Sequence, residues 1–382
     1  MWETRVNNQA KSKNDEGYLR WFDYIPDNIL DCHKLAHRKV IEVWNQKKKN
    51  RIEWIDIAKG ILIILVVYGH FCQNFAYNTN TIAMIRRFIY AFHIPAFFML
   101  SGIVFNTNCN FSIREFSIRK YKSLLLPGYV GIIVYAVYFG VIEGGSFIRP
   151  VLSIKNVIKE FLWMSSAELG FWFLGALFSL SIILYATHKY VKNEIYRMLI
   201  AVVLTCCGLA CKQLMSDSCN WPFSIIQASA SALFFELGFQ LKNLIQKPIY
   251  CTEIISALIS GGGLLCAIKL NPFEYNIGVW NVGVGDMQWY LLSGIAGSIF
   301  ILGISRLICK MPFIHLKKAL IMFGKSSLYI YVYHSILVGY CKDHIISIKN
   351  QWSDVVVFLG AILVCWIISI LLDACRLLRI RG

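Results

Sequence analysis

Three polar side chains interrupt a strongly apolar stretch of the sequence, RIEWIDIAKGILIILVVYGH (residues 51–70). Asp56 and Lys59 lie near its beginning, and His70 ends it. Charged groups and unsatisfied hydrogen-bond donors are costly in hydrocarbon, so a simple membrane anchor needs none of the three. Their types point to two kinds of chemistry: a lysine can bind phosphate, and a neutral imidazole can accept a proton as a general base.

The spacing of these residues places them together on one side of a helix. With 3.6 residues per turn, Lys59 and His70 differ by only about 20° in direction, and Asp56 lies within about 40° of His70. This stripe should face the interior of a bundle, where intramembrane polar groups normally face. Lys59 and His70 are about 16 Å apart along the axis, so they could contact both ends of one long ligand. The alternative is structural: an interfacial Asp56–Lys59 ion pair and a hydrogen-bonded histidine.

The elements that carry this stripe are predicted from composition. Of the 382 residues, 57% are hydrophobic and 16% are charged, whereas soluble domains are closer to half apolar and a quarter charged. Apolar runs of about 17 to 25 residues can each span a bilayer as a helix. We predict an all-α integral membrane protein, a bundle of about ten transmembrane helices. The ten candidate spans are Ile55–Phe71, Phe88–Phe105, Leu124–Ile142, Phe171–Thr187, Met198–Leu214, Phe223–Leu241, Ile249–Lys269, Trp289–Leu307, Ser327–Cys341 and Val355–Leu372.

The net charge of +16 is distributed unevenly along the chain. With ten spans, both termini share one side of the membrane, and 28 of the 38 Lys and Arg residues fall on that side. The positive-inside rule then predicts a multi-pass protein of the inner (plasma) membrane with both termini in the cytoplasm. Topology therefore accounts for the positive charge, and no nucleic-acid partner is expected.

The chain divides into three predicted parts. Residues 1–50 are a polar, basic cytoplasmic extension, residues 51–375 are the transmembrane domain, and residues 376–382 are a basic cytoplasmic tail. The extension has apolar positions at helical spacing, so it could be a short helix on the inner membrane surface or a poorly ordered tail. Longer outward connections could form an acceptor-binding mouth, or be polar only because they are exposed. They span residues 143–170, 215–222, 270–288 and 342–354.

Several familiar chemistries are excluded. MFGKSS (residues 322–327) resembles the end of a phosphate-binding loop, but Ala319 stands where the first glycine of that motif belongs. The chain has no G-x-S-x-G or H-E-x-x-H motif, and we expect no bound metal or cofactor. The thirteen cysteines are an odd number and lie mostly within spans, which argues against a disulfide framework. A bridge between Cys211 and Cys219, near the outward face, is left open.

Three further stretches combine histidine, basic or small polar residues with apolar runs: AFHIPAFFMLSG (91–102), IRKYKSLLLP (118–127) and SLYIYVYHS (327–335). Together with WIDIAKGILIILVVYGH in the first span, they resemble the acyltransferase-3 family of multispan membrane O-acyltransferases, particularly its fucose-acetylase-like branch. The resemblance covers residues 51–375, and the first-span motif is its specific part. It implies that the protein is an enzyme that transfers acyl groups.

The resemblance also implies roles for the matching residues. His70 corresponds to the family's catalytic histidine, and Lys59 to the basic position, usually arginine, that precedes it. Arg119 and Lys122 correspond to a second basic motif, usually R-x-x-R, that serves the acyl-CoA donor. A lysine in place of arginine still binds phosphate, but as a point charge and less rigidly. Further residues are candidates for acceptor binding or a supporting role: Asp56, His93, Ser101, Tyr333 and His334.

This chemistry agrees with the stripe on the first span. The phosphates of coenzyme A could rest against Lys59, Arg119 and Lys122 while its pantetheine arm runs along the first span toward His70. His70 would then remove the proton from an acceptor hydroxyl as the hydroxyl attacks the acyl carbon. The developing oxyanion needs a donor. Ser101, Tyr333 and His334 are the candidates.

We therefore predict a membrane O-acyltransferase, in particular an O-acetyltransferase that moves acetyl from acetyl-CoA to a hydroxyl of a cell-surface polysaccharide or lipid-linked glycan. Acetyl-CoA, or another acyl-CoA, is a co-substrate, and the other partners are the carbohydrate acceptor and membrane lipids. The alternative from another class is a glycan transporter, flippase or polysaccharide-export component that uses the stripe as a binding path. A polymerase of sugar units is a third, more distant hypothesis.

Overall fold

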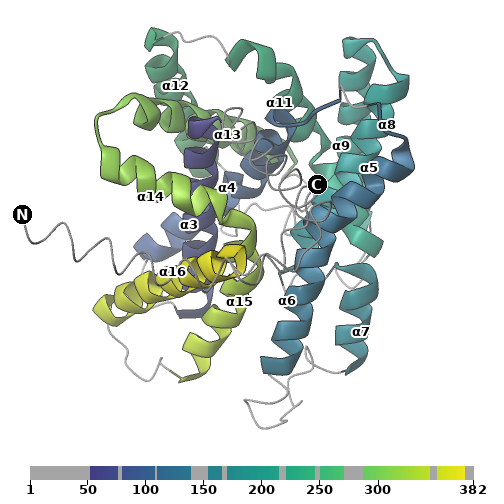
Figure 1. Cartoon of the computed structure of the whole chain (residues 1–382). Helices are drawn as coiled ribbons and strands as arrows, with labels where there is room; N and C mark the ends of the chain where they lie inside the picture. The colour runs from purple at the N-terminus through teal and green to yellow at the C-terminus, as the bar shows by residue number, and fades with distance from the viewer. Residues whose placement is uncertain are drawn as a thin grey trace, which may run out of the picture. The chain divides into compact units, whose positions relative to one another are not determined.

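Helices make up the fold throughout the described part of the chain, where no β-strand occurs (Figure 1). The computed structural model describes residues 52–75, 80–107, 110–138, 154–165, 170–214, 221–245, 250–270, 287–344 and 351–374. From Glu53 onward the chain forms one unit of contacting helices. The prediction of an all-α protein is therefore confirmed for these residues.

The helices follow one another closely along the chain. In order, they are α3 (Glu53–Phe75), α4 (Asn80–Ile103), α5 (Ile113–Lys120), the π-helical turn η1 (Tyr121–Leu125), α6 (Leu126–Val137), α7 (Ile154–Trp163), α8 (Trp172–Tyr190), α9 (Glu194–Leu214), the 3₁₀ turn η4 (Pro222–Ser224), α10 (Ile225–Ala230), α11 (Ala232–Ile245), α12 (Tyr250–Leu270), α13 (Met287–Lys310), α14 (Ile314–Lys325), α15 (Ser327–His344) and α16 (Gln351–Ala374).

Each of the ten predicted spans overlaps, within the described residues, a helix or a run of consecutive helices. Within the described residues, however, only α3, α4, α9 and α13 are both long and apolar enough to cross a membrane, or five spans if the bent pair α10–α11 counts as one. Shorter apolar helices lie in α12, α15 and α16. The membrane character agrees with the prediction, whereas the count of about ten spans is not confirmed.

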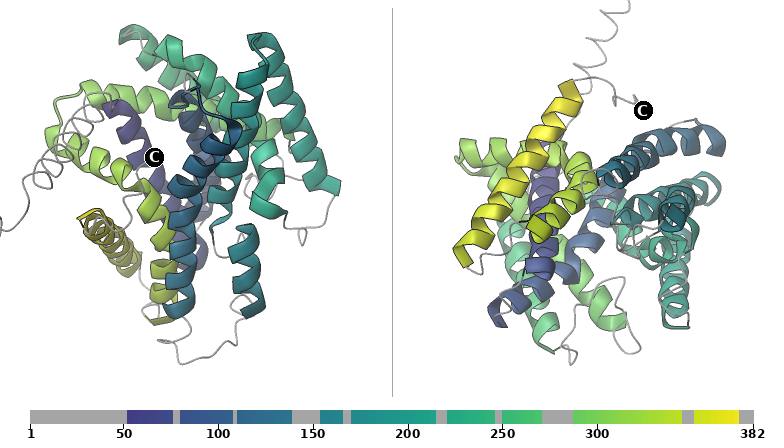
Figure 2. Two further views of the ribbon diagram at one scale, coloured as in Figure 1. Left: turned by 45° about the vertical axis from the view of Figure 1, so that its right-hand side comes forward. Right: turned by 90° about the horizontal axis from the view of Figure 1, so that it is seen from below.

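Helices α3 and α4 lie at the centre of the packing. Helix α3 contacts α4, α13, α14, α15 and α16, and α4 also contacts α11 and α12. Helix α16 crosses α15 and also contacts α3 (Figure 2). Because neighbours surround α3, its polar stripe faces protein, as the sequence predicts for intramembrane polar groups. The largest fully buried side chains of this core include Phe92, Phe98, Phe234 and Tyr290.

Two glycines bring α14 against the first turns of α3. A Cβ atom on Gly324 would overlap the carbonyl oxygen of Asp56, and one on Gly60 would overlap the carbonyl oxygen of Leu320. Small residues let helix backbones approach this closely, which is how helices associate in membranes. This crossing holds the Asp56–Lys59 end of the stripe beside the start of α15.

A proline inside α4 shapes the segment that carries His93. Pro95 has no N–H to give to the carbonyl of Ala91, which leaves that buried acceptor without its usual helical partner. The Ser293 hydroxyl of α13 lies 3.2 Å from this carbonyl and 2.6 Å from that of Trp289, so it can donate to either. Helix α13 thereby compensates for the proline next to His93.

Helices α10 and α11 form one apolar run that bends by 65°. The bend falls at Ser231, and the N–H of Leu233 just beyond it donates to the Thr205 hydroxyl of α9 at 3.0 Å. A side chain from a neighbouring helix thus satisfies a backbone group that the break exposes. The sequence predicted one span here, Phe223–Leu241.

Helices α5, η1 and α6 form one continuous helical rod (Figure 1). A capping box starts it: the N–H of Ser112 donates to Glu115 at 2.7 Å, and the N–H of Glu115 donates to the Ser112 hydroxyl at 3.2 Å. These bonds from Ser112 lower the pKa of Glu115. The predicted span starts at Leu124, but the helical rod starts at Ile113, so the basic motif lies within the rod, across the end of α5 and the π-helical turn η1.

Some predictions concern segments outside the described residues. These are the extension of residues 1–50, the tail of residues 376–382 and most of the outward connections. Cys211 has a free thiol, while Cys219 lies outside the described part of the chain.

Candidate functional site

Three helices bring histidine and tyrosine rings together. The ring centroids of His70 on α3 and His334 on α15 are 5.1 Å apart. Tyr90 on α4 lies 6.1 Å from His70 and 5.0 Å from His93, again between ring centroids. The three histidines within the predicted spans therefore form one cluster around Tyr90. His93 and His334 are buried, and His70 is partly buried.

Backbone carbonyls orient two of these imidazoles. Nδ1 of His334 lies 2.6 Å from the carbonyl oxygen of Tyr331, and Nδ1 of His93 lies 2.8 Å from that of Ile89. A carbonyl can only accept, so Nδ1 is the donor in both rings. In the neutral rings Nε2 is then the nitrogen that can accept a proton or a hydrogen bond.

A cavity of about 150 Å³ lies between α3, α4, α8, α15 and η1. Most of its walls are apolar, but Lys59, Ser101 and Ser327 bring polar atoms to it. Its lining residues are Lys59, Ile63 and Val66 of α3; Ile94, Phe97 and Ser101 of α4; Leu124 of η1; Phe173, Leu174 and Leu177 of α8; and Ser327, Leu328 and Tyr331 of α15.

The cavity and the histidine cluster lie along the same helix faces. One turn beyond Val66 on α3 is His70, and one turn beyond Tyr331 on α15 is His334. Helix α4 runs in the opposite direction, so the residue one turn from Ile94 toward the cluster is Tyr90. The cavity therefore extends from Lys59 along α3 toward the His70–His334 pair. Of the stripe predicted from sequence, Lys59 lines the cavity, whereas Asp56 and His70 do not.

A comparison with protein families identifies the chain. Residues 52–371 match the family model described as an acyltransferase domain, which covers most of the chain. The chain belongs to the acyltransferase-3 family. It is therefore a membrane acyltransferase, and the resemblance inferred from four motifs is confirmed at the level of the family. The fucose-acetylase-like branch is not confirmed, and a search among curated proteins gave no match.

The sequence also predicted Asp56, Ser101 and Tyr333 as acceptor-binding or supporting residues of this acyltransferase. Asp56 is buried, 4% exposed, next to the α14 crossing. Ser101 lies at the Lys59 end of the cavity, and its hydroxyl donates to the Phe97 carbonyl at 2.8 Å. It lies about 16 Å along α4 from Tyr90, far from the histidine cluster. Tyr333 is buried but does not line the cavity.

The two residues of the predicted basic motif point away from the cavity. Arg119 is exposed, and its guanidinium lies over the Phe111 ring, 4.1 Å from the centroid. Lys122 is also exposed. Neither lines the cavity. Matching the motif by sequence did not reveal that the residue between them, Lys120, faces inward.

Lys120 is the cation of α5 that the sequence analysis missed. Its Nζ lies 5.5 Å from the centroid of the Phe116 ring and 5.8 Å from that of Phe105. Burial, and secondarily the positive charge of Lys59, lower the pKa of Lys120 to about 8. Lys120 is thus close enough to Lys59 for the two charges to repel each other.

A buried carboxylate was also missed. Glu160 of α7 is 2% exposed and accepts a hydrogen bond from the N–H of Ser165 at 3.1 Å. Tyr331, which lines the cavity, donates its hydroxyl hydrogen to the Gly170 carbonyl in the segment that follows. Glu160 lies in the predicted outward connection of residues 143–170, for which the sequence left open an acceptor-binding mouth or an exposed polar loop.

The histidine cluster does not form a metal site. Across the described ranges, no three His, Cys, Asp or Glu side chains lie close enough together to hold a metal ion. The arrangement offers proton acceptors in the histidine cluster and, one turn away, a largely apolar cavity that contains the cation Lys59. A proton acceptor is one of the parts that acyl transfer to a hydroxyl requires.

Proposed function

We propose that this membrane acyltransferase is an acyl-CoA-dependent O-acetyltransferase that modifies a hydroxyl of a cell-surface polysaccharide or lipid-linked glycan. The observation that carries the proposal is the cavity that Lys59 lines and whose walls end one helical turn before the His70–His334 pair. A long donor could place its anionic head at Lys59 and its reactive end near the histidine pair. Coenzyme A thioesters have that form.

In this proposal His70 is the general base. Its imidazole takes the proton of the acceptor hydroxyl while the hydroxyl oxygen attacks the thioester carbon. The C–O bond of the ester forms, the C–S bond breaks, and the proton passes on to the leaving thiolate to give free coenzyme A. His334, 5.1 Å from His70 between ring centroids, is the neighbour best placed to orient it or to share its proton.

The donor would enter from the cytoplasm, at the Lys59 end. Lys59 lines the cavity there, and Arg119 and Lys122 on the neighbouring rod add positive charge for the phosphates. The cavity is small beside pockets of roughly 300–1,000 Å³ that hold drug-sized ligands. A slim pantetheine chain suits it better than a glycan does, which favours an enzyme over a transporter with a glycan path.

The acceptor would approach the histidine cluster from the opposite side. Tyr90 and His93 are then the nearest groups for its hydroxyls and sugar rings, because Tyr90 lies beside both His70 and His93. The choice of a glycan as acceptor, and of the fucose-acetylase-like branch, rests on the motif resemblance.

Purified protein in lipid nanodiscs with acetyl-CoA carrying a labelled acetyl group tests the proposal. We expect slow hydrolysis without an acceptor and transfer of the label to added lipid-linked or polysaccharide glycans. The same preparation in proteoliposomes measures the alternative, glycan movement across the bilayer. Glycan flux without any consumption of acetyl-CoA would refute the enzyme assignment.

A further inference from the structure

Helix α4 carries an arginine inside a candidate membrane span. The part of α4 that is long and apolar enough to cross a membrane runs from Ile82 to Ile103, so Arg86 lies about one turn inside it. The sequence placed the start of this span at Phe88, which left Arg86 outside. Charged side chains within membrane helices are rare, usually face protein or a water-filled space, and mark the path of a ligand or ion. Arg86 is therefore a candidate for ligand binding.

The guanidinium of Arg86 is not simply extended into the surroundings. The residue is partly buried, and its Nε is an atom that solvent does not reach. Among the described residues, this Nε has no hydrogen-bond partner, although leaving a buried donor unsatisfied is costly. A cation near the end of a membrane helix usually extends its charged head to the interface. At Nε, by contrast, protein encloses the guanidinium.

Arg86 shares one face of α4 with the histidine cluster. Tyr90 and His93 follow it by four and seven residues, so they differ from it by only about 40° and 20° in direction. Tyr90 is the ring that lies beside both His70 and His93. Along α4, the cavity lining from Ser101 onward therefore comes first, the histidine cluster second and Arg86 last. Arg86 lies beyond the cluster, on the side away from the cavity.

Helix α3 packs against this face of α4. A Cβ atom on Gly69 would lie 3.0 Å from the Tyr90 ring, so Tyr90 contacts α3 directly beside His70. Because α3 and α4 run in opposite directions, Arg86 is level with the turn of α3 that follows His70. Helix α3 ends soon afterwards, at Phe75. The structural alternative is that Arg86 only donates to the free carbonyls at this helix end.

We propose that Arg86 binds an anionic group of the acceptor, a carboxylate or a phosphate, on the side of the histidine cluster away from the cavity. That the ligand is a glycan acceptor rests on the proposed function above. A guanidinium is always charged, and its rigid fork of N–H donors matches two oxygens of either anion. An anion held there would bring neighbouring hydroxyls of the same glycan toward Tyr90, about 6 Å further along α4, and toward His70 beside it.

Two parts of the proposed acceptor can carry such an anion. An acidic polysaccharide has carboxylates on its sugars, whereas a lipid-linked glycan has a phosphate that joins the sugar to the lipid. Both would make the same charge-assisted contact with Arg86. Probes that share one sugar ring but differ in the charged group distinguish the two sources.

Equilibrium binding of radiolabelled glucuronate, glucose 1-phosphate and glucose to the full chain in nanodiscs tests the site. We expect wild type to bind at least one charged sugar about tenfold or more tightly than glucose. Glucuronate as the preferred probe would indicate an acidic sugar, and glucose 1-phosphate would indicate the phosphate link. Arg86→Gln should bind all three probes alike, although its amide can still donate to the carbonyls at the end of α3. Arg86→Lys, a point charge without the fork, should keep only part of the preference.

The matched control is Arg114→Gln, which removes an exposed arginine of α5 and should keep the wild-type preference. Equal binding of the three probes by wild type, or no binding of any, overturns the site, and so does an unchanged preference in Arg86→Gln. Should Arg86→Gln fail to fold, phenylglyoxal modification of wild type decides. The preferred charged sugar should slow modification of Arg86 but not of Arg114, and equal slowing of both or of neither overturns the site.

A parallel assay with labelled acetyl-CoA separates this inference from the proposed function. If no acetyl group reaches any glycan while the charge preference still depends on Arg86, the anion site stands and the acetyltransferase assignment fails. If acetyl transfer proceeds and Arg86→Gln keeps the charge preference, the acetyltransferase assignment stands and the anion site is refuted.

Discussion

The imidazoles of His70 and His334 lie with their ring centroids 5.1 Å apart, although they come from the first and ninth predicted spans. His334 is held by its bond from Nδ1 to the Tyr331 carbonyl. That bond leaves Nε2 of the neutral His334 ring as an acceptor near the proposed base. We therefore assign the two residues separate roles that can be tested: His70 as the proposed base, and His334 as the neighbour that orients it or shares its proton.

Replacing His70 tests the general base. We expect His70→Ala to lower turnover by at least about 100-fold, the usual scale for losing a general base, while coenzyme A affinity is largely kept. Activity of the wild type should also fall on acidification, because a protonated imidazole cannot accept the hydroxyl proton. Steady-state kinetics and calorimetry check both statements.

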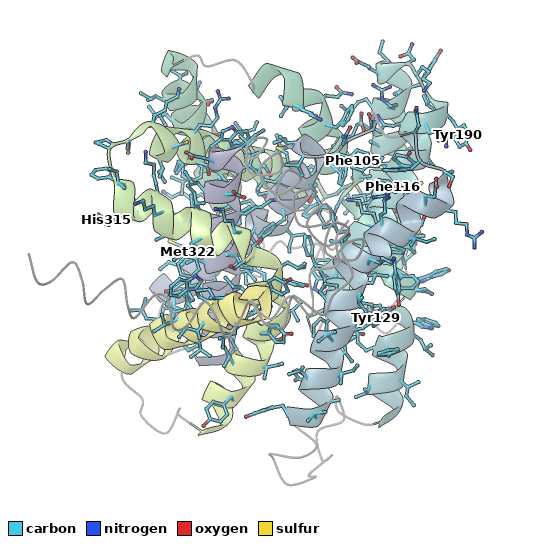
Figure 3. All side chains as sticks on the ribbon, in the orientation of Figure 1. Phe105, Phe116, Tyr129, Tyr190, His315 and Met322 are labelled. Carbon is cyan, nitrogen blue, oxygen red and sulfur yellow. The ribbon has the colours of Figure 1, made fainter. Side chains whose placement is uncertain are left out.

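The control for this variant is His315→Ala. His315 lies exposed on α14 (Figure 3), and its replacement should leave turnover unchanged. A structural His70 would behave differently: His70→Ala would lower yield and thermal stability, and the folded fraction would keep near-normal turnover. That result would end the catalytic assignment.

Two substitutions at His334 distinguish a structural role, the hydrogen bond to the Tyr331 carbonyl, from a role in proton transfer. His334→Asn can still donate to the Tyr331 carbonyl, whereas His334→Ala leaves that bond unmade. We expect both variants to lose turnover, by less than His70→Ala does, because both lack the Nε2 acceptor. The melting temperature should fall mainly in His334→Ala. Full activity in His334→Asn would mean that the residue only supports the backbone.

A pair of glycine substitutions tests the crossing of α3 and α14. Gly324→Ala should cost about 1 to 3 kcal/mol, because the new methyl group would overlap the Asp56 carbonyl and push the helices apart. Gly262→Ala on α12 is the matched control: nothing lies within 4 Å of its added Cβ, so higher helix propensity should make it neutral or stabilising. Thermal unfolding of both variants measures the difference. Equal melting temperatures would show that the crossing tolerates a Cβ.

The ten-span topology needs its own experiment. Single cysteines introduced at positions 145, 215, 280 and 347 should all react with a membrane-impermeant reagent from outside, because both termini are predicted to be cytoplasmic. Two or more of them labelled only from inside would refute the ten-span arrangement.

Hydrophobic patterning was enough to predict the helices. Each apolar run coincides with helical segments, and the stripe of Asp56, Lys59 and His70 faces neighbouring helices as their angular spacing predicted. These features are local: helical periodicity and the cost of burying polar groups in hydrocarbon determine them within one segment. The family membership was likewise readable from motifs, because the first-span motif lies within a single helix.

Contacts between distant segments were decided only by tertiary structure. Periodicity within one helix carries no information about which helices are neighbours, so it could not pair His70 with His334 or place Tyr90 between His70 and His93. The basic motif shows the same limit within one rod. The π-helical turn after Lys120 breaks the regular angular step, so only the folded chain shows Lys120, and not Arg119 or Lys122, packed against buried rings beside Lys59.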